Sequence, residues 1–186
     1  ISLTNLGIDQ NVFNMPTDEN PKSDFTFTVT PAVDLRLRFV RTVVTGSVNE
    51  DLVWYQTFAT ERAVNSAFNL GWLIPLNRVS FKMNARHANL RDRPGFEIDA
   101  RSRRSETGYD GVLEVRIFPK TFVGGTARRQ ATAYDKDAVF LNSNLQFELN
   151  RATLGGGVSL RYQLTPLTSV SLVTTHTQDR FEFSAL

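Results

Sequence analysis

The strongest pattern in this chain is an alternation of apolar and polar residues between residues 25 and 39. One set is Phe25, Phe27, Val29, Val33, Leu35, Leu37 and Phe39, and the other is Thr26, Thr28, Thr30, Asp34, Arg36 and Arg38. Successive side chains of a β-strand point to opposite faces, so the pattern predicts one long ribbon with an apolar face and a charged face. Pro31 interrupts this ribbon because it removes one donor from the hydrogen-bond ladder.

The same alternation recurs along the chain. Further strands are predicted over residues 1–13, 44–54, 67–74, 79–86, 109–117, 121–134, 154–164 and 170–177, with one helical turn at 144–150. We therefore predict an all-β fold: an antiparallel up-and-down meander of about nine strands, forming a transmembrane β-barrel or a truncated part of one. Residues 1–186 are predicted to be a single outer-membrane β-barrel domain, incomplete at its C-terminus.

The connections between these segments are of two kinds that alternate. Short connections lie near residues 40–42, 76–78, 119–121 and 165–168, whereas long polar ones lie at 14–24, 57–62, 91–106 and 134–153 and after 179. In a meander this order places every short turn at one end of the sheet and every long loop at the other. Outer-membrane barrels show this asymmetry.

Composition excludes several other classes of protein. The chain is 41% hydrophobic and 22% charged, which is too apolar for intrinsic disorder. No apolar run of about 18 residues predicts a membrane helix, although barrel strands give only a weak hydropathy signal. The chain lacks cysteine and has two histidines, so we predict no metal site, no cofactor and no disulfide. A net charge of +2, with aromatic residues in the apolar phase, argues against nucleic-acid binding.

In a barrel, the two faces of each strand would meet lipid and lumen. The lipid-facing candidates are Phe25, Phe27, Val29, Leu35 and Leu37, and the lumen-facing candidates are Asp34, Arg36, Arg38, Lys82, Arg86, Glu114, Arg116 and Arg161. Aromatic residues near strand ends are candidates for the girdles at the two membrane interfaces, namely Phe39, Trp54, Trp72, Phe118 and Tyr162.

The basic residues of the chain are 17 Arg and 4 Lys. Guanidinium groups pair bidentately with carboxylates and phosphates and keep their charge. One interpretation of the lumen-facing arginines is a pathway that favours anionic solutes or an anionic polysaccharide. The other, which the sequence favours, is a network of Arg–carboxylate pairs that braces the wall.

Other reactive side chains give weaker signals, and we predict that the protein is not an enzyme. His87 and His176 lie at predicted strand ends, but no Gly-x-Ser-x-Gly elbow accompanies them. The acidic run 135–137 lacks the spacing of a calcium loop. The basic run 101–104 falls in a predicted outer loop, where it could pair with lipopolysaccharide phosphates or remain solvated. The three glycines at 155–157 open a strand and form no phosphate loop.

Several short motifs resemble one family when they are taken together in order. They are Gly7 to Phe13, Ser23 to Phe25 with Thr30-Pro31, Arg91 to Gly95 with Glu97 to Arg101, Leu164 to Thr168, and Asp179 to Ser184. This series resembles the β-barrel porin 2-like group of bacterial outer-membrane β-barrel proteins, and the resemblance covers most of the chain.

The resemblance implies an outer-membrane location in a Gram-negative type of cell, with outer-membrane lipid and lipopolysaccharide as partners. It also implies a porin-like role in passing solutes or an exported polysaccharide, because some relatives are linked with exopolysaccharide gene clusters. The chain departs from the family in lacking a final strand with a terminal aromatic residue. Two alternatives stay open: a non-transporting structural or interaction barrel of the envelope, and a soluble lipocalin-like barrel that binds a ligand.

Overall fold

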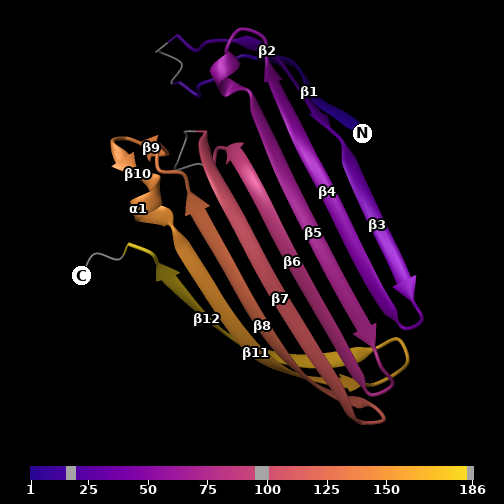
Figure 1. Cartoon of the computed structure of the whole chain (residues 1–186). Coiled ribbons are helices and arrows are strands. Elements are labelled where there is room, and N and C mark those ends of the chain that lie inside the picture. The colour runs from indigo at the N-terminus through magenta and orange to yellow at the C-terminus, as the bar shows by residue number, and fades with distance from the viewer. Residues whose placement is uncertain (16–19, 95–100, 184–186) are drawn as a thin grey trace.

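The computed structural model describes residues 1–15, 20–94 and 101–183. Strands form most of it (Figure 1). They are β1 (Ser2–Asp9), β2 (Asp24–Thr30), β3 (Ala32–Phe39), β4 (Thr42–Tyr55), β5 (Ala63–Pro75), β6 (Val79–Asp92), β7 (Ser102–Phe118), β8 (Thr121–Tyr134), β9 (Val139–Phe140), β10 (Ser143–Asn144), β11 (Arg151–Gln163) and β12 (Ser169–Phe181). The helices are the 3-10 turn η2 (Ala59–Glu61) and the short α1 (Leu145–Leu149).

The large strands form one antiparallel sheet in the order β1-β2-β4-β5-β6-β7-β8-β11-β12, with β3 also paired to β4. The short strands β9 and β10 pair only with each other. Strands that pair in the large sheet thus follow one another along the chain. The exceptions are β3, which lies between β2 and β4 in the sequence, and β9 and β10, which lie between β8 and β11. The predicted all-β antiparallel meander is confirmed.

The predicted ribbon 25–39 is present as β2 followed by β3. Both pair with β4 in one continuous register, because Val29 lies opposite Leu52 and Ala32 lies opposite Asn49. At the break, the backbone N–H of Glu50 donates to the carbonyl of Pro31 at 3.1 Å. Proline has no N–H with which to return this bond, so the ladder loses one rung while the register is kept.

Turns and loops are sorted between the two ends of the sheet as predicted. The connections β3–β4, β5–β6, β7–β8 and β11–β12 are short and lie at one end, and the longer connections lie at the other (Figure 1). We call these the short-turn end and the long-loop end. Consequently β1 and β12, the two outermost strands, both run toward the long-loop end.

The predicted helical turn at 144–150 is confirmed as α1. Asn144 caps it, with its side-chain oxygen accepting a hydrogen bond from the backbone N–H of Gln146 at 2.9 Å. Asparagine at this position satisfies one of the N–H groups that a helix leaves unpaired at its start.

The predicted loop at 91–106 is wrong at both of its ends. β6 continues to Asp92 and β7 begins at Ser102, because the ladder runs on through the pair Arg91–Arg103. Charged residues in this region suggested a solvated loop, but in the sheet they alternate between two faces. His87, predicted at a strand end, consequently lies inside β6. Residues 95–100, which carry part of the resemblance motif, and Ser184 lie outside the described residues.

Strand pairing assembles the alternating residues into one apolar face and one polar face across the sheet. Along one row of paired residues, Leu37, Val44, Trp72 and Met83 lie side by side on the apolar face. The next row, on the polar face, contains Arg36, Thr45, Gly71, Asn84 and Asp110. The alternation in each segment therefore continues across the whole sheet.

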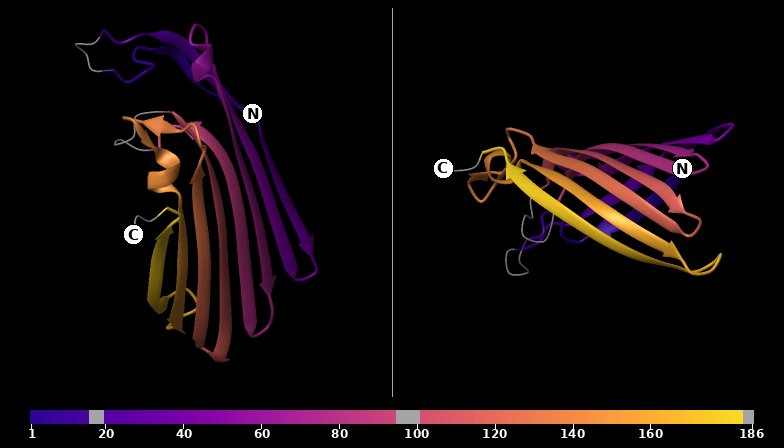
Figure 2. Two further views of the ribbon diagram at one scale, coloured as in Figure 1. Left: turned by 60° about the vertical axis from the view of Figure 1, so that its left-hand side comes forward. Right: turned by 90° about the horizontal axis from the view of Figure 1, so that it is seen from below.

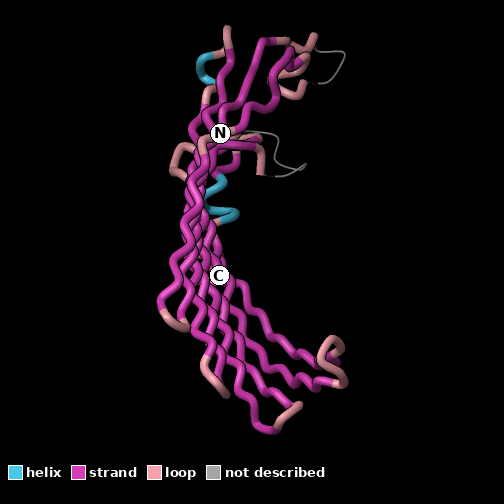
Figure 3. The backbone as a smooth tube through the Cα atoms, turned by 90° about the vertical axis from the view of Figure 1, so that its right-hand side faces the viewer, coloured by secondary structure: helices cyan, strands magenta, loops and turns pink. Residues whose placement is uncertain are grey.

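The sheet is twisted and curved, and its edges remain open (Figures 2 and 3). Among the described residues, β1 and β12 do not pair with each other. Helix α1 and the segment before it pack over the polar face, since Leu145 and Ala138 are buried against Tyr134, which pairs with Arg104 on that face. The polar face is therefore the side that the long-loop end partly covers.

Buried apolar side chains are few in the described part of the chain. They are Val12, Tyr55, Ala63, Tyr134, Ala138 and Leu145, all at or near the long-loop end. No second layer of structure packs on the apolar face of the described sheet. A soluble sheet normally covers its apolar face with such a layer.

Candidate functional site

All eight predicted lumen-facing residues lie on the polar face. Asp34, Arg36 and Arg38 belong to β3, Lys82 and Arg86 to β6, Glu114 and Arg116 to β7, and Arg161 to β11. Their pairing partners place them on one side of the sheet, which we call the polar wall.

The ion pair between Arg161 and Glu114 spans three strands of the polar wall. The guanidinium of Arg161 donates to both carboxylate oxygens of Glu114, at 3.0 Å from Nε and 2.6 Å from the terminal nitrogen. It also lies 3.8 Å from the ring centroid of Phe122, whose strand β8 separates β7 from β11. This bidentate pair thus connects two strands across a third and uses the ring between them as a support.

The other predicted lumen-facing cations are not paired in this way. Among the described residues, Arg36, Arg38, Lys82, Arg86 and Arg116 form no ion pair. The bracing interpretation therefore accounts for Arg161, whereas five cations keep their charge available to a solute in front of the wall.

Small residues on the polar wall leave room for a hollow near Arg86 and Asp110. The Arg86 side chain lies across Gly108, where an added Cβ would come within 2.9 Å of its Nε. Nearby, the Asn84 side chain donates to Asp110 at 2.7 Å. A hollow of about 500 Å³ lies here, lined by residues that include Asp34, Arg36 and Arg86. The arrangement offers donors, acceptors and free cations in one shallow groove.

The five predicted lipid-facing residues all lie on the apolar face, together with their paired neighbours in the other strands. Large apolar side chains there remain exposed, for example Leu35 at 53% and Leu70 at 55%. From Val33 to Phe39 the exposed apolar face of β3 runs about 20 Å along the strand. This length is close to the apolar band of about 25 Å found around transmembrane barrels.

The predicted girdle residues fall near both ends of the sheet. Phe39, Trp72, Phe118 and Tyr162 lie in the half nearer the short turns, and Trp54 lies at the long-loop end. Trp54 stacks on Phe27 with ring centroids 6.2 Å apart. The guanidinium of Arg62 lies over the Trp54 ring, 3.4 Å from its centroid. Exposed aromatic rings thus lie toward both ends of the apolar face.

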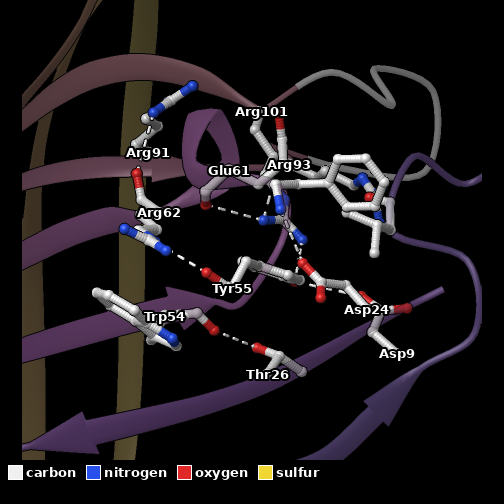
Figure 4. Close-up of polar contacts among 12 residues, drawn as sticks. Asp9, Asp24, Thr26, Trp54, Tyr55, Glu61, Arg62, Arg91, Arg93 and Arg101 are labelled. Carbon is white, nitrogen blue, oxygen red and sulfur yellow. Dashed lines mark hydrogen bonds and ion pairs between the residues drawn. The ribbon is translucent and has the colours of Figure 1, made fainter. Parts of the chain in front are cut away.

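A second polar cluster lies at the long-loop end of the polar face (Figure 4). Its centre is Tyr55, which is 4% exposed and donates to Asp9 at 3.2 Å. Arg101 donates to the Tyr55 hydroxyl, lies over its ring, and forms an ion pair with Glu61 at 3.6 Å. These contacts join β1, β4 and the segment before β7, and they fix this end of the sheet.

Asp24 anchors the turn that follows β4. Its carboxylate accepts hydrogen bonds from the backbone N–H groups of Phe25, Thr57 and Phe58, at 2.8, 2.9 and 2.9 Å. Burial acts to raise the pKa of this carboxyl, but these three N–H groups outweigh it and hold the pKa below the ordinary value of 3.8. Asp24 therefore holds the turn most strongly in its ionised form.

Asn150 has a similar role beside α1. It is buried, accepts from the backbone N–H of Tyr134 at 2.7 Å, and donates to the Glu182 carboxylate at 2.9 Å. It therefore ties the ends of β8 and β12 to the start of β11. The alternation predicts none of the roles of Asp24, Tyr55, Asn150 and Arg101. The one sequence feature that could have indicated these residues is that they lie at or next to the ends of strands.

The basic run 101–104 is divided by the structure. Ser102, Arg103 and Arg104 belong to β7 rather than to an outer loop, so that expectation is wrong for them. Arg104 pairs with Asp92 and Glu106 on the polar face, and Arg103 is exposed on the apolar face. The two neighbours thus serve opposite sides of the sheet.

Two of the remaining candidates are neighbours. His176 lies within β12, directly opposite Gly156 of β11, so its predicted position at a strand end is wrong. Asp135 follows β8, away from this pair. Among the described residues, no group of three His, Cys, Asp or Glu side chains is arranged to hold a metal ion. The helices of the described chain are all too short or too polar to cross a membrane.

Comparisons with models of known families, with curated proteins and with solved structures found no match to this chain. The geometry of the two faces is therefore the basis of the functional conclusion.

Proposed function

We propose that this sheet is part of the wall of an outer-membrane β-barrel, porin-like in type, that passes solutes or an exported polysaccharide across the outer membrane. The observation that carries the proposal is the exposed apolar face, which extends over all the long strands and which no layer formed by the described residues covers. In water such a face would be costly, at about 25 cal/mol per Å² of apolar surface. Lipid removes that cost.

Strand length and loop position also support this function. β4 to β8, β11 and β12 have 13 to 17 residues each, and about 9–11 residues suffice for a tilted strand to cross a bilayer. The long loops lie at one end, as in barrels with short periplasmic turns and long outer loops. The resemblance to the β-barrel porin 2-like group favours the same class.

The polar wall would then face the lumen and favour anionic solutes, because its free cations outnumber its free carboxylates. A planar-bilayer measurement on the full-length protein tests this. We expect channels whose reversal potential in a KCl gradient shows chloride preference, and Arg36→Glu should reduce that preference. Arg41→Glu, the same charge change in the short turn between β3 and β4, should leave it nearly unchanged. Cation-selective wild-type channels would contradict an anion pathway.

A second function is favoured by one specific observation. The α1 segment and the Tyr55 cluster cover part of the polar face at the long-loop end. If this cover closes the lumen, the protein is a non-transporting structural or interaction barrel of the envelope. A protein that inserts into the bilayer but conducts no current would support this second function over the first.

A further inference from the structure

Beyond the wall itself, the apolar face carries a hollow at its long-loop end. Its volume is about 820 Å³, and its lining includes Phe27, Leu52, Trp54 and Val64 as an apolar floor. Four arginines line the same hollow, namely Arg62, Arg91, Arg103 and Arg104, and the last of these is already paired with Asp92 and Glu106. An apolar floor beside several guanidinium groups is unusual on this face, where most other side chains are uncharged.

The floor of the hollow is well ordered by its own contacts. Trp54 is stacked on Phe27 on one side and covered by the Arg62 guanidinium. Arg62 is held in turn, because its Nε donates to the carbonyl of Tyr55 at 2.8 Å and the Arg91 guanidinium donates to the backbone carbonyl of Arg62 at 3.1 Å. The aromatic rings and the first two guanidiniums are thus positioned before any ligand arrives.

Arg103 supplies the free charge. It is exposed on the apolar face, and among the described residues its guanidinium forms no ion pair or hydrogen bond. The acidic residue that lines the hollow with it is Asp135, which leaves the guanidiniums in excess. Arg103 therefore offers an unused bidentate donor beside an exposed apolar floor.

We propose that this hollow binds the phosphate headgroup of a membrane lipid of the lipopolysaccharide type, with an acyl chain on the Leu52, Trp54 and Val64 floor. This inference rests on the proposed membrane location and adds a lipid site to it. A guanidinium fork matches phosphate oxygens in geometry and charge. The apolar floor favours a lipid over a free anion, since Trp54 is 41% and Val64 is 61% exposed and both continue the lipid-facing surface.

Native mass spectrometry of the full-length protein in detergent tests the proposal with bis-phosphorylated lipid A as the probe. We expect the wild-type protein to retain one tightly bound lipid, and Arg103→Ala to weaken its binding roughly tenfold, as loss of a charged hydrogen bond does. Arg103→Lys should give an intermediate affinity, because it keeps the charge but loses the fork. Arg41→Ala, at the opposite end of the sheet, should bind as the wild type does.

Two further arms identify the ligand. Dephosphorylated lipid A should bind as weakly to the wild type as lipid A does to Arg103→Ala, and inorganic phosphate should not displace lipid A. Equal binding to wild type and Arg103→Ala, displacement by inorganic phosphate, or an Arg103-dependent dimer of this chain would each overturn the lipid site. Flotation with liposomes tests the membrane location separately, so a protein that inserts but binds no lipid A refutes only this inference.

Discussion

At the scale of single residues, the polar face uses charge in two ways. Arg161 is held by Glu114 and by the ring of Phe122, so its charge is neutralised within the wall and connects the strands. Arg36 and Lys82 project from the same face with no such partner among the described residues. The register places Arg116 in the same row as Arg161, two strands away, and Glu114 lies two residues further along β7, where the long Arg161 side chain reaches it diagonally.

Asp24 allows a sharp test at this scale. Its pKa is lowered in the folded protein, so its stabilising contribution is complete above the unfolded value near 3.8 and is lost as the pH falls through the folded pKa. We expect Asp24→Asn to lower the melting temperature at pH 6, since an amide is a poorer acceptor for three N–H groups. At strongly acidic pH the two proteins should converge.

Circular dichroism melts of both proteins between pH 2 and pH 7 measure this difference. Thr30→Val is the matched control, because Thr30 also contacts a strand neighbour, donating to Asp51 at 2.7 Å, but has no titratable group of its own. A gap between wild type and Asp24→Asn that stayed constant down to pH 2 would contradict the role of the ionised carboxyl.

At the scale of elements, each long strand presents one side to the apolar face of the sheet and the other side to the polar face. Leu70 and Asn69 are adjacent in β5, but Leu70 lies on the apolar face and Asn69 donates to Ser47 on the polar face. In a membrane the two faces have different solvents. In water they would tolerate a charge more equally, so a pair of substitutions in one strand separates the two cases.

We expect Leu70→Arg to destabilise the protein folded in lipid bilayers by about 2–4 kcal/mol, the cost of a cation at the lipid face near the midplane. Asn69→Arg, one residue away on the polar face, should cost much less. Reversible urea unfolding in lipid vesicles, followed by tryptophan emission, measures both. Similar losses for the two variants would argue for a soluble sheet.

The elements were largely predictable from the sequence because period-2 alternation depends on local backbone geometry. The ribbon 25–39 is a case in which the pattern was sufficient. The pattern failed at 91–106, since Arg91 and Arg103 are a cross-strand pair. Their pairing depends on a neighbouring strand rather than on local polarity. The Tyr55 cluster was missed for the same reason, because Asp9 and Arg101 are distant from Tyr55 in the sequence.

At the scale of the whole molecule, the apolar face gives two built-in reporters. Trp54 and Trp72 are the two tryptophans of the chain, and both lie on this face, Trp54 at the long-loop end and Trp72 in the other half. Interfacial aromatic residues of barrels lie at the level of the lipid headgroups. Their fluorescence therefore reports both insertion and depth.

We expect brominated phosphatidylcholine to quench both tryptophans of the reconstituted protein, bromines near the headgroups more strongly than bromines near the chain ends. The single-tryptophan variants Trp54→Phe and Trp72→Phe separate the two signals, and unbrominated vesicles are the control. Emission that is unaffected by any brominated lipid would refute the outward position of the apolar face.

The direction of the edge strands has an arithmetic consequence. β1 and β12 both run toward the long-loop end, so joining them directly would create a parallel pair in an otherwise antiparallel sheet. A closed antiparallel barrel needs an even number of strands, because each strand must run opposite to both of its neighbours. Any complete ring built on this sheet with antiparallel pairing therefore includes an odd number of further strands between β12 and β1.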